Sequence, residues 1–498
     1  MNDSKVTIFK NASALMLSQI ITWALTLALM VFLPRYLGAT AVGQLTFAQS
    51  IWAIAGVLIA FGMDTYLMKE IARYPDKTPE LIGASMVTRG FFCILGFGGV
   101  ALYMHLLHYP TITTHIVYII GVSVVIGQFT QTFQSALYGL ERMELASLSL
   151  IGGKLVNTVL GIIILLMGYG VYIVAVVIVI AAFTEMVLQL YFLNRRYRLH
   201  LRFRLHESLD MLKSSAPYLM SVLIVTVYFQ VDVLLLSILV NEAEIGLYSV
   251  ALRLTSAFMF LPVILTTAIF PAIARSYANV PEASLRVMGR GFDLMLLLGV
   301  PIGMGLFAIS DRIVILLFGK EFAPSGLIVA FMAISLIFTY LSTMFGRFVI
   351  ATDRVNQWTL VIFVATVATI PMDIYLIPWC QRIFGIGALA GAISYLITEF
   401  GMVSAGILLL PRGIFAWSNV RTVLLSAGSG MAMVGVCWWS EAMPLAITIG
   451  LGALTYTGLI FLTRAVPSTE IAMFTDLARQ GLARFRRPEA ESPGIPGV

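Results

Sequence analysis

About ten ionisable side chains lie inside segments whose composition otherwise predicts membrane spans. A charge near the bilayer centre costs at least ~2.5 kcal/mol, so such residues normally face a protein interior or a water-filled cavity. A chain that carries this many predicts a polar passage through the membrane. The residues are Asp64, Arg89, Lys154, Glu185, Asp232, Arg253, Asp293, Arg347, Asp373 and Glu399.

Several of these charges can neutralise one another. Counting 1.5 Å per residue places Asp232 and Arg253 at a similar depth, roughly 11 Å from the outer boundary. The candidate pairs are Asp232 with Arg253, Lys154 with Glu185 near the inner side, and Arg290 with Asp293 along one helix. A pair that only fixes neighbouring helices is the competing interpretation. The acids without an evident partner are candidates to line the passage: Asp64, Asp373 and Glu399.

The composition predicts an all-α integral membrane protein. Hydrophobic residues make up 59% of the chain and charged residues 11%, against about 25% charged in soluble domains. Crossing ~30 Å of hydrocarbon takes about 20 apolar residues, and we expect the first apolar run to be an uncleaved span. About fourteen runs qualify: 12–34, 41–64, 81–104, 115–138, 146–168, 170–193, 215–240, 246–270, 290–310, 325–350, 357–378, 384–410, 419–440 and 443–463.

The distribution of basic residues predicts the topology. With the N-terminus in the cytoplasm, one side receives 23 of the 31 lysine and arginine residues and the other receives four, as the positive-inside rule requires. The basic excess therefore reflects topology, and we expect no nucleic-acid partner. We also expect both termini in the cytoplasm and an amphipathic tail on the inner leaflet.

An internal repeat divides the chain. Four short matches follow one another at offsets of about 200 residues: Gly43 with Gly246, Ile71-Ala72-Arg73 with Ile273-Ala274-Arg275, Arg89-Gly90-Phe91 with Arg290-Gly291-Phe292, and Glu141-Arg142 with Asp353-Arg354. The offset covers six spans, so the two halves keep the same orientation across the membrane. The expected parts are an N-terminal lobe (1–194), a basic cytoplasmic linker (195–214), a C-terminal lobe (215–411), two added spans (412–464) and a cytoplasmic amphipathic or disordered tail (465–498).

Motifs of soluble catalysis are missing from the sequence. No Gly-x-x-x-x-Gly-Lys-Ser/Thr loop is present for nucleotide phosphates, and no Gly-x-Ser-x-Gly nucleophile elbow occurs. The three cysteines lie in apolar segments without zinc spacing. The histidines His105, His108 and His115 around one loop are more economically explained as interfacial polar residues than as metal ligands. We therefore expect no cofactor, no metal and no enzymatic activity.

The chain resembles the polysaccharide transporter (oligosaccharide flippase) family, which shares a superfamily with multidrug extruders and the lipid II flippase. The resemblance extends over all fourteen predicted spans. The strings that carry it are Phe-Leu-Pro-Arg35-Tyr-Leu-Gly38 followed by Gly43, Lys69-Glu-Ile-Ala-Arg73, Gly139-Leu-Glu141-Arg142, Ser215-Ala-Pro217 before Asp232, Gly246-Leu-Tyr248 before Arg253, and Leu-Phe318-Gly319 with Phe322 and Pro324.

The resemblance implies a transporter that moves a polyprenyl-diphosphate-linked sugar from the inner to the outer leaflet of the cytoplasmic membrane by alternating access. A coupling H⁺ or Na⁺, membrane lipids, a polysaccharide polymerase and glycosyltransferases are the implied partners. Cations in the central cavity would hold the diphosphate, and Arg35 at an outer turn could act at release. The expected substrate-binding residues are Arg89, Lys154, Arg253, Arg347 and Arg35, and the expected ion or charge-pair residues are Asp232, Glu185, Asp64, Asp293 and Glu399.

Other functions remain open from the sequence. The ten intramembrane charges comprise six acids and four bases, and this excess of acids also fits an ion-coupled exporter of small cationic compounds. A lipid II flippase is a further alternative within the superfamily. A membrane-embedded glycan polymerase or ligase would need a large outer loop, and the longest one expected is only residues 311–324.

Overall fold

The computed structural model describes residues 2–197, 205–279, 281–411 and 413–463. These residues form helices and contain no β-strand, which confirms the predicted all-α class and agrees with the need to satisfy backbone polar groups within lipid. The helices are α1 (Asn2–Ala60), α2 (Met63–Arg73), η1 (Pro75–Lys77), α3 (Thr78–Leu106), α4 (Thr111–Gly139), α5 (Met143–Leu166), α6 (Val171–Tyr197), α7 (Leu205–Leu239), α8 (Glu242–Ser256), α9 (Phe260–Asn279), α10 (Pro281–Ala308), α11 (Ser310–Phe318), η2 (Lys320–Phe322), α12 (Ser325–Ala351), α13 (Val355–Phe384), α14 (Leu389–Leu409), α15 (Trp417–Trp439) and α16 (Leu445–Leu462).

Helix α1 contains two of the predicted spans. Thirteen helical segments of the described chain are long and apolar enough to cross a membrane, and the first of them runs over 46 residues from Leu15 to Ala60. At 1.5 Å per residue that is about 69 Å, more than twice the hydrocarbon thickness. The chain bends at Gly38, whose φ of 79° favours glycine. Two spans in α1 and twelve in the other segments agree with the predicted fourteen.

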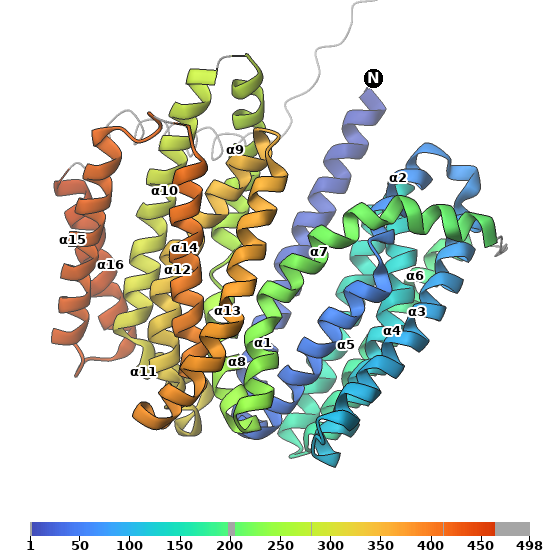
Figure 1. Ribbon diagram of the computed structural model, residues 1–498, viewed down its shortest axis with the longest axis horizontal. Helices are drawn as coiled ribbons and strands as arrows, with labels where there is room; N and C mark the ends of the chain where they lie inside the picture. The colour runs from blue at the N-terminus through green and yellow to red at the C-terminus, as the bar shows by residue number, and fades with distance from the viewer. Residues whose placement is uncertain (1, 198–204, 280, 412, 464–498) are drawn as a thin grey trace, which may run out of the picture.

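The helices gather into two bundles (Figure 1). One contains α2 to α6 with α1, and the other contains α9 to α16, while α7 and α8 lie near the contact between them. The two bundles converge at the end that carries α8 and diverge toward the end that carries α2 and the N-terminus. We call these the outer and the inner end, after the predicted topology.

The repeat is visible in the turns at the inner end. Glu141 and Asp353, which the sequence matches, both adopt left-handed backbone with φ of 56° and 61°, a conformation that few non-glycine residues adopt. The next residues, Arg142 and Arg354, both have φ of −107° at the start of a helix. Equivalent turns therefore precede α5 in one bundle and α13 in the other, as a parallel repeat requires.

The outer end is closed where the two bundles meet. A Cβ atom on Gly43 would lie 1.7 Å from the Glu242 carbonyl oxygen, and one on Gly246 would lie 1.9 Å from the Ala39 carbonyl oxygen, so α1 and α8 touch backbone to backbone. The Glu242 carboxylate accepts hydrogen bonds from Gln44 at 2.7 Å and from Thr113. The residues that the repeat pairs, Gly43 and Gly246, therefore lie on opposite sides of one contact.

The eighth predicted span, 246–270, is not one continuous helix. Helix α8 ends at Ser256, and α9 begins at Phe260. Pro262 in the first turn of α9 has no N–H to donate, and the Phe258 carbonyl, four residues earlier, accepts the Tyr340 hydroxyl at 2.6 Å instead. The fifteen residues of α8 rise about 22 Å, so the break lies past the middle of the ~30 Å core.

Three further stretches differ from expectation or cannot be compared with it. Helix α7 begins at Leu205, inside the expected linker 195–214, and its Met211 is fully buried with residues of α2 and α4. The expected outer loop at 311–324 contains α11 and η2, and the Glu321 carboxylate accepts the Ala39 amide at 2.7 Å beside the bend in α1. The expected tail, 465–498, lies outside the described residues.

Candidate functional site

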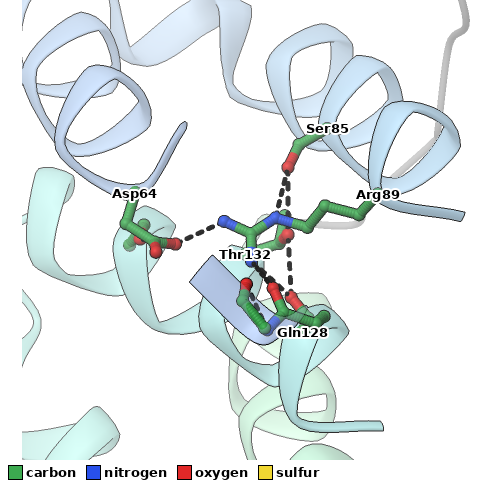
Figure 2. A network of polar contacts seen from close by, with 7 residues as sticks. Asp64, Ser85, Arg89, Gln128 and Thr132 are labelled. Carbon is green, nitrogen blue, oxygen red and sulfur yellow. Dashed lines mark hydrogen bonds and ion pairs between the residues drawn. The ribbon is translucent and has the colours of Figure 1, made fainter. Parts of the chain in front are cut away.

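A buried polar network occupies the inner half of the N-terminal bundle (Figure 2). The Arg89 side chain has no solvent exposure and forms an ion pair with Asp64. Its Nη1 donates to the Gln128 carbonyl at 3.0 Å and to the Gln128 side chain at 2.9 Å, and its Nε donates to Ser85 at 3.3 Å. Ser85 in turn shares a hydrogen bond with Thr132. The network joins α2, α3 and α4 through one guanidinium.

Arg89 and Asp64 differ in their access to open space: the Arg89 side chain is fully buried, and the Asp64 side chain is partly exposed. All three nitrogens of the Arg89 guanidinium have partners. Asp64 keeps 36% of its side chain exposed and also accepts a hydrogen bond from Ser135 at 3.3 Å. Arg89, expected to contact substrate, thus lies behind Asp64, which is the member of the pair that reaches open space.

That space is a cavity of about 550 Å³ between α1, α2, α4, α6 and α7. Its volume falls within the roughly 300–1,000 Å³ of small-molecule sites. Asp64 is the one ionisable carboxylate among its described lining residues, and no lysine or arginine lines it. Most of its polar groups are amides and hydroxyls, provided by Gln49, Thr65, Ser123, Gln128, Gln131 and Tyr218.

These amide and hydroxyl side chains carry no charge, so they do not stand out in the apolar spans of the sequence. The signal that could have found them is periodic: Gln128 and Gln131 are three apart in an otherwise apolar span, so they share one helix face. Gln128 is doubly engaged, since its Nε2 also donates to the Gly56 carbonyl at 3.2 Å. Gln131 is exposed, so it is available to a ligand in the cavity.

The C-terminal bundle buries two neighbouring acids, one on α7 and one on α13. Asp232 accepts the Tyr248 hydroxyl at 2.7 Å, and Asp373 accepts the Ser394 hydroxyl at 2.5 Å. The two carboxyl groups lie next to each other, and each retains one buried oxygen without a donor in the described structure. Asp232 and Arg253, expected as a pair, form no ion pair among the described side chains.

A third buried acid lies on α14 of the same bundle. Glu399 is 2% exposed and accepts hydrogen bonds from Tyr228 at 2.9 Å and from Ser342 at 2.7 Å. Tyr228 and Tyr248 are both buried in the core and donate to the carboxylates of Glu399 and Asp232, because a phenol in a core also needs a polar partner.

The other predicted cations are distributed along the bundles. Arg35 is exposed near the bend of α1, and Arg347 is half-buried one turn before the end of α12. Arg253 lies in the last turn of α8, just before the break that separates α8 from α9. None of these three lines the 550 Å³ cavity.

The remaining predicted residues lie between neighbouring helices. Lys154 on α5 interacts electrostatically with Glu185 on α6, without an ion pair within 4 Å among the described side chains. The two helices touch closely there, since a Cβ on Gly153 would lie 2.9 Å from the Glu185 Cβ. Asp293 on α10 lies beside Asn419 of α15.

Comparison with known proteins agrees with this architecture. Lipid II flippase MurJ in an inward closed conformation has a TM-score of 0.70 at 13% identity, covering 92% of this chain and 99% of that one. An inward-facing multidrug resistance MATE family transporter has a TM-score of 0.61 at 13% identity, covering 82% and 94%. At these identities the likeness establishes the fold.

The sequence comparisons define the family. The chain is 23% identical over 251 residues to the probable low-salt glycan biosynthesis flippase Agl15 of Haloferax volcanii, and it spans about half the length of that relative (52%). A MatE family model matches residues 217–375. The family described as "Polysaccharide biosynthesis protein" matches residues 8–277, more than half of the chain. The chain belongs to this family, and it is a multi-pass membrane protein with the fold of MurJ and the MATE transporter.

Proposed function

We propose that the protein flips a polyprenyl-diphosphate-linked oligosaccharide from the inner to the outer leaflet of the cytoplasmic membrane, for polysaccharide biosynthesis. The termini then lie in the cytoplasm, and no covalent catalysis is involved. Glycosyltransferases would build the substrate, and a polymerase would use the product. A polar headgroup cannot cross hydrocarbon unaided, because each unsatisfied polar group there costs several kcal/mol.

The cavity in the N-terminal bundle is the observation that carries this proposal. Its amide and hydroxyl lining, with a tryptophan in the wall, suits sugar hydroxyls, which both donate and accept hydrogen bonds. Gln49 and Gln131 are exposed on facing helices. A site for an organic cation would more naturally be lined by several acids, and here Asp64 already neutralises Arg89.

The diphosphate needs a separate positive group, and Arg253 is the best placed of the predicted cations. It lies at the end of α8, immediately before the start of α9. The N-terminus of a helix favours negative charge, and broken helices near the membrane midplane commonly form ion sites in transporters. We propose that Arg253 and the break bind the diphosphate, while Arg35 at the outer end assists release.

The buried acids of the C-terminal bundle are proposed as the coupling site for H⁺ or Na⁺. Asp232 and Asp373 each retain a buried oxygen without a donor. Leaving such a group unpaired is costly, and a cation or proton between the two carboxyl groups would remove that cost. Binding there would link an ion gradient to the packing of α7 against α13.

A second candidate function is the export of small cations. Asp64 favours it, because this residue lines the cavity and is partly exposed. A lipid II headgroup is a third candidate substrate, because its sugar hydroxyls can form hydrogen bonds with the same amide side chains. The charge of the transported compound distinguishes the first two candidate functions: the lipid-linked oligosaccharide is anionic, and the exported compound would be cationic.

Reconstitution in liposomes tests the proposal. The protein should move a fluorescent polyprenyl-diphosphate disaccharide and should not move an organic cation such as ethidium. Gln131→Leu removes an exposed cavity amide and should slow flipping about tenfold, the equivalent of one or two hydrogen bonds. Export of the cation without movement of the lipid-linked sugar would reject the proposal.

A matched control lies one turn away on the same helix. Gln134 donates to Tyr138 at 3.0 Å and does not line the cavity. Gln134→Leu should therefore leave the flipping rate within about twofold of the unmodified protein, because the side chain that it removes lies outside the cavity. Equal losses in the two variants would place the effect on helix α4 rather than on the cavity.

A further inference from the structure

An apolar groove lies on the opposite side of α1 from the polar cavity. It encloses about 460 Å³ between α1, α3 and α7, again within the roughly 300–1,000 Å³ of ligand sites. Leu58 and Leu95 in its walls are 46% and 53% exposed, so the groove is open to the surface of the bundle. No charged residue occurs among the lining side chains that the structure describes.

Helix α1 is the wall between the groove and the cavity. Ile51, Ala55 and Leu58 line the groove, whereas Trp52 and Gly56 line the cavity. Because successive helical residues turn by about 100°, these two sets occupy opposite faces of one helix. A single helix thus carries an apolar site on one face and a polar site on the other.

Helix α7 borders both sites as well. Its Leu234 lines the groove, and its Tyr218 and Val222 line the cavity. The seam between α1 and α7 therefore borders both sites, the cavity at Val222 and the groove at Leu234, about 18 Å further along α7. A molecule with a polar head and an apolar chain can occupy both sites by crossing this seam.

We infer that the groove holds the isoprenoid chain of the substrate while the sugar headgroup occupies the cavity. This inference rests on the proposed function. From Phe92 to Tyr103, both lining residues of α3, the helix rises about 16 Å, which is about half of the hydrocarbon core. The groove thus accompanies the chain over a long stretch and keeps it beside the seam as the bundles move.

The groove acts by shape rather than by apolar attraction. Lipid tails are as apolar as leucine, so moving a chain from bilayer to groove releases little free energy. What the groove supplies is a fixed position for the first part of the chain relative to the headgroup. Filling it should therefore affect substrates with a long chain and spare those whose chain is too short to enter.

Two adjacent glycines provide the test. A Cβ on Gly98 or on Gly99 meets no atom within 4 Å, so both positions accept a larger side chain. Gly99 lines the groove, and Gly98 does not. Gly99→Trp fills the groove, and Gly98→Trp is the matched control on the same helix.

The full-length variants are compared in phosphatidylethanolamine–phosphatidylglycerol liposomes. The probes are a long-chain polyprenyl-diphosphate disaccharide and the same headgroup on a chain of two isoprene units. We expect Gly99→Trp to slow the long-chain probe about tenfold, since small misplacement of a substrate has effects of this size or more. The short-chain probe should move equally well with both variants and with the unmodified protein.

A cross-linking measurement on the unmodified protein makes the test independent of how the variants fold. A long-chain probe with a photoreactive isoprene should label the peptide that contains Leu95 and Gly99. Label confined to other helices, or equal rates for Gly99→Trp and Gly98→Trp, would mean that the groove holds an ordinary bilayer lipid. If the unmodified protein moves neither probe, the proposed function fails instead.

Discussion

At the scale of single residues, the contact between Arg89 and Asp64 predicts a large effect on stability. Breaking a buried ion pair by removing one partner costs 3–5 kcal/mol, and Asp64 is partly exposed, so we expect Arg89→Ala to lower the free energy of unfolding by about 3 kcal/mol. Chemical unfolding in detergent measures the loss. The repeat provides the control, because Arg290 is exposed and Arg290→Ala should cost less than about 1 kcal/mol. Similar losses in both variants would show that the network is not the cause.

The acids of the C-terminal bundle predict an effect on coupling. Asp232→Asn keeps the shape of the side chain but replaces one oxygen of the Asp232–Asp373 site with a donor, so no cation is needed there. We expect the cation dependence of transport to fall about tenfold, which lies within the usual range of coupling energies. The measurement compares flipping rates with and without Na⁺ and proton gradients. Asp76→Asn, at an exposed inner position, is the control, and an unchanged gradient response in Asp232→Asn would remove this site from coupling.

At the same scale, the sequence predicted which charged residues lie within the spans, but it did not predict which residues they contact. The positions of Asp64 and Arg89 inside apolar runs were evident, but their contact joins two helices, and no spacing along the chain encodes it. Matching depths favoured Asp232 with Arg253, whereas Asp232 meets Tyr248 on that same helix, α8. Depth fixes the level of a residue in the membrane, and the rotation of each helix decides which neighbour it faces.

At the scale of elements, the contact between α1 and α8 predicts a shift between conformations. Because the two helices touch backbone to backbone at Gly43, Gly43→Ala cannot form the closed outer end without displacement. We expect the variant to populate a state with a wider outer end. Spin labels at Ile112→Cys and Ile383→Cys, on exposed sites near that end, should report a longer distance. Gly98→Ala meets open space, so a matching increase there would contradict the explanation.

The elements themselves were largely predictable from the sequence. An apolar run of sufficient length forms a membrane span regardless of the helices beside it, so the spans could be predicted. The turns at Glu141 and Asp353 have the same left-handed backbone conformation, as the repeat implied. The break between α8 and α9 was missed, although Pro262 within the expected span was a usable signal. A proline alone permits a break, and the Tyr340 hydroxyl that satisfies the freed Phe258 carbonyl comes from a distant part of the chain.

At the scale of the whole molecule, two bundles that touch at the outer end can separate only if that contact breaks. The structure is closed at this end by Gly43, Gln44 and Thr113 against α8. Flipping by alternating access requires this contact to open in every cycle. A covalent link across it should therefore stop transport without disturbing either bundle.

The pair Gln44→Cys and Glu242→Cys can be joined by a bifunctional thiol reagent with a reducible spacer, because the ends of the two longer native side chains are within 2.7 Å of each other. Cross-linking should abolish flipping, and a reductant should restore it. The control links two helices of one bundle: a Cβ at Gly452 lies 2.8 Å from the native Cys437 sulfur, so Gly452→Cys can form a disulfide between α15 and α16. Oxidising this variant should leave the rate unchanged, because α15 and α16 move together as one body. Flipping that continues in the cross-linked Gln44→Cys/Glu242→Cys variant would mean that the substrate crosses without opening the outer end, and the two bundles would then have to act by some motion other than rocking.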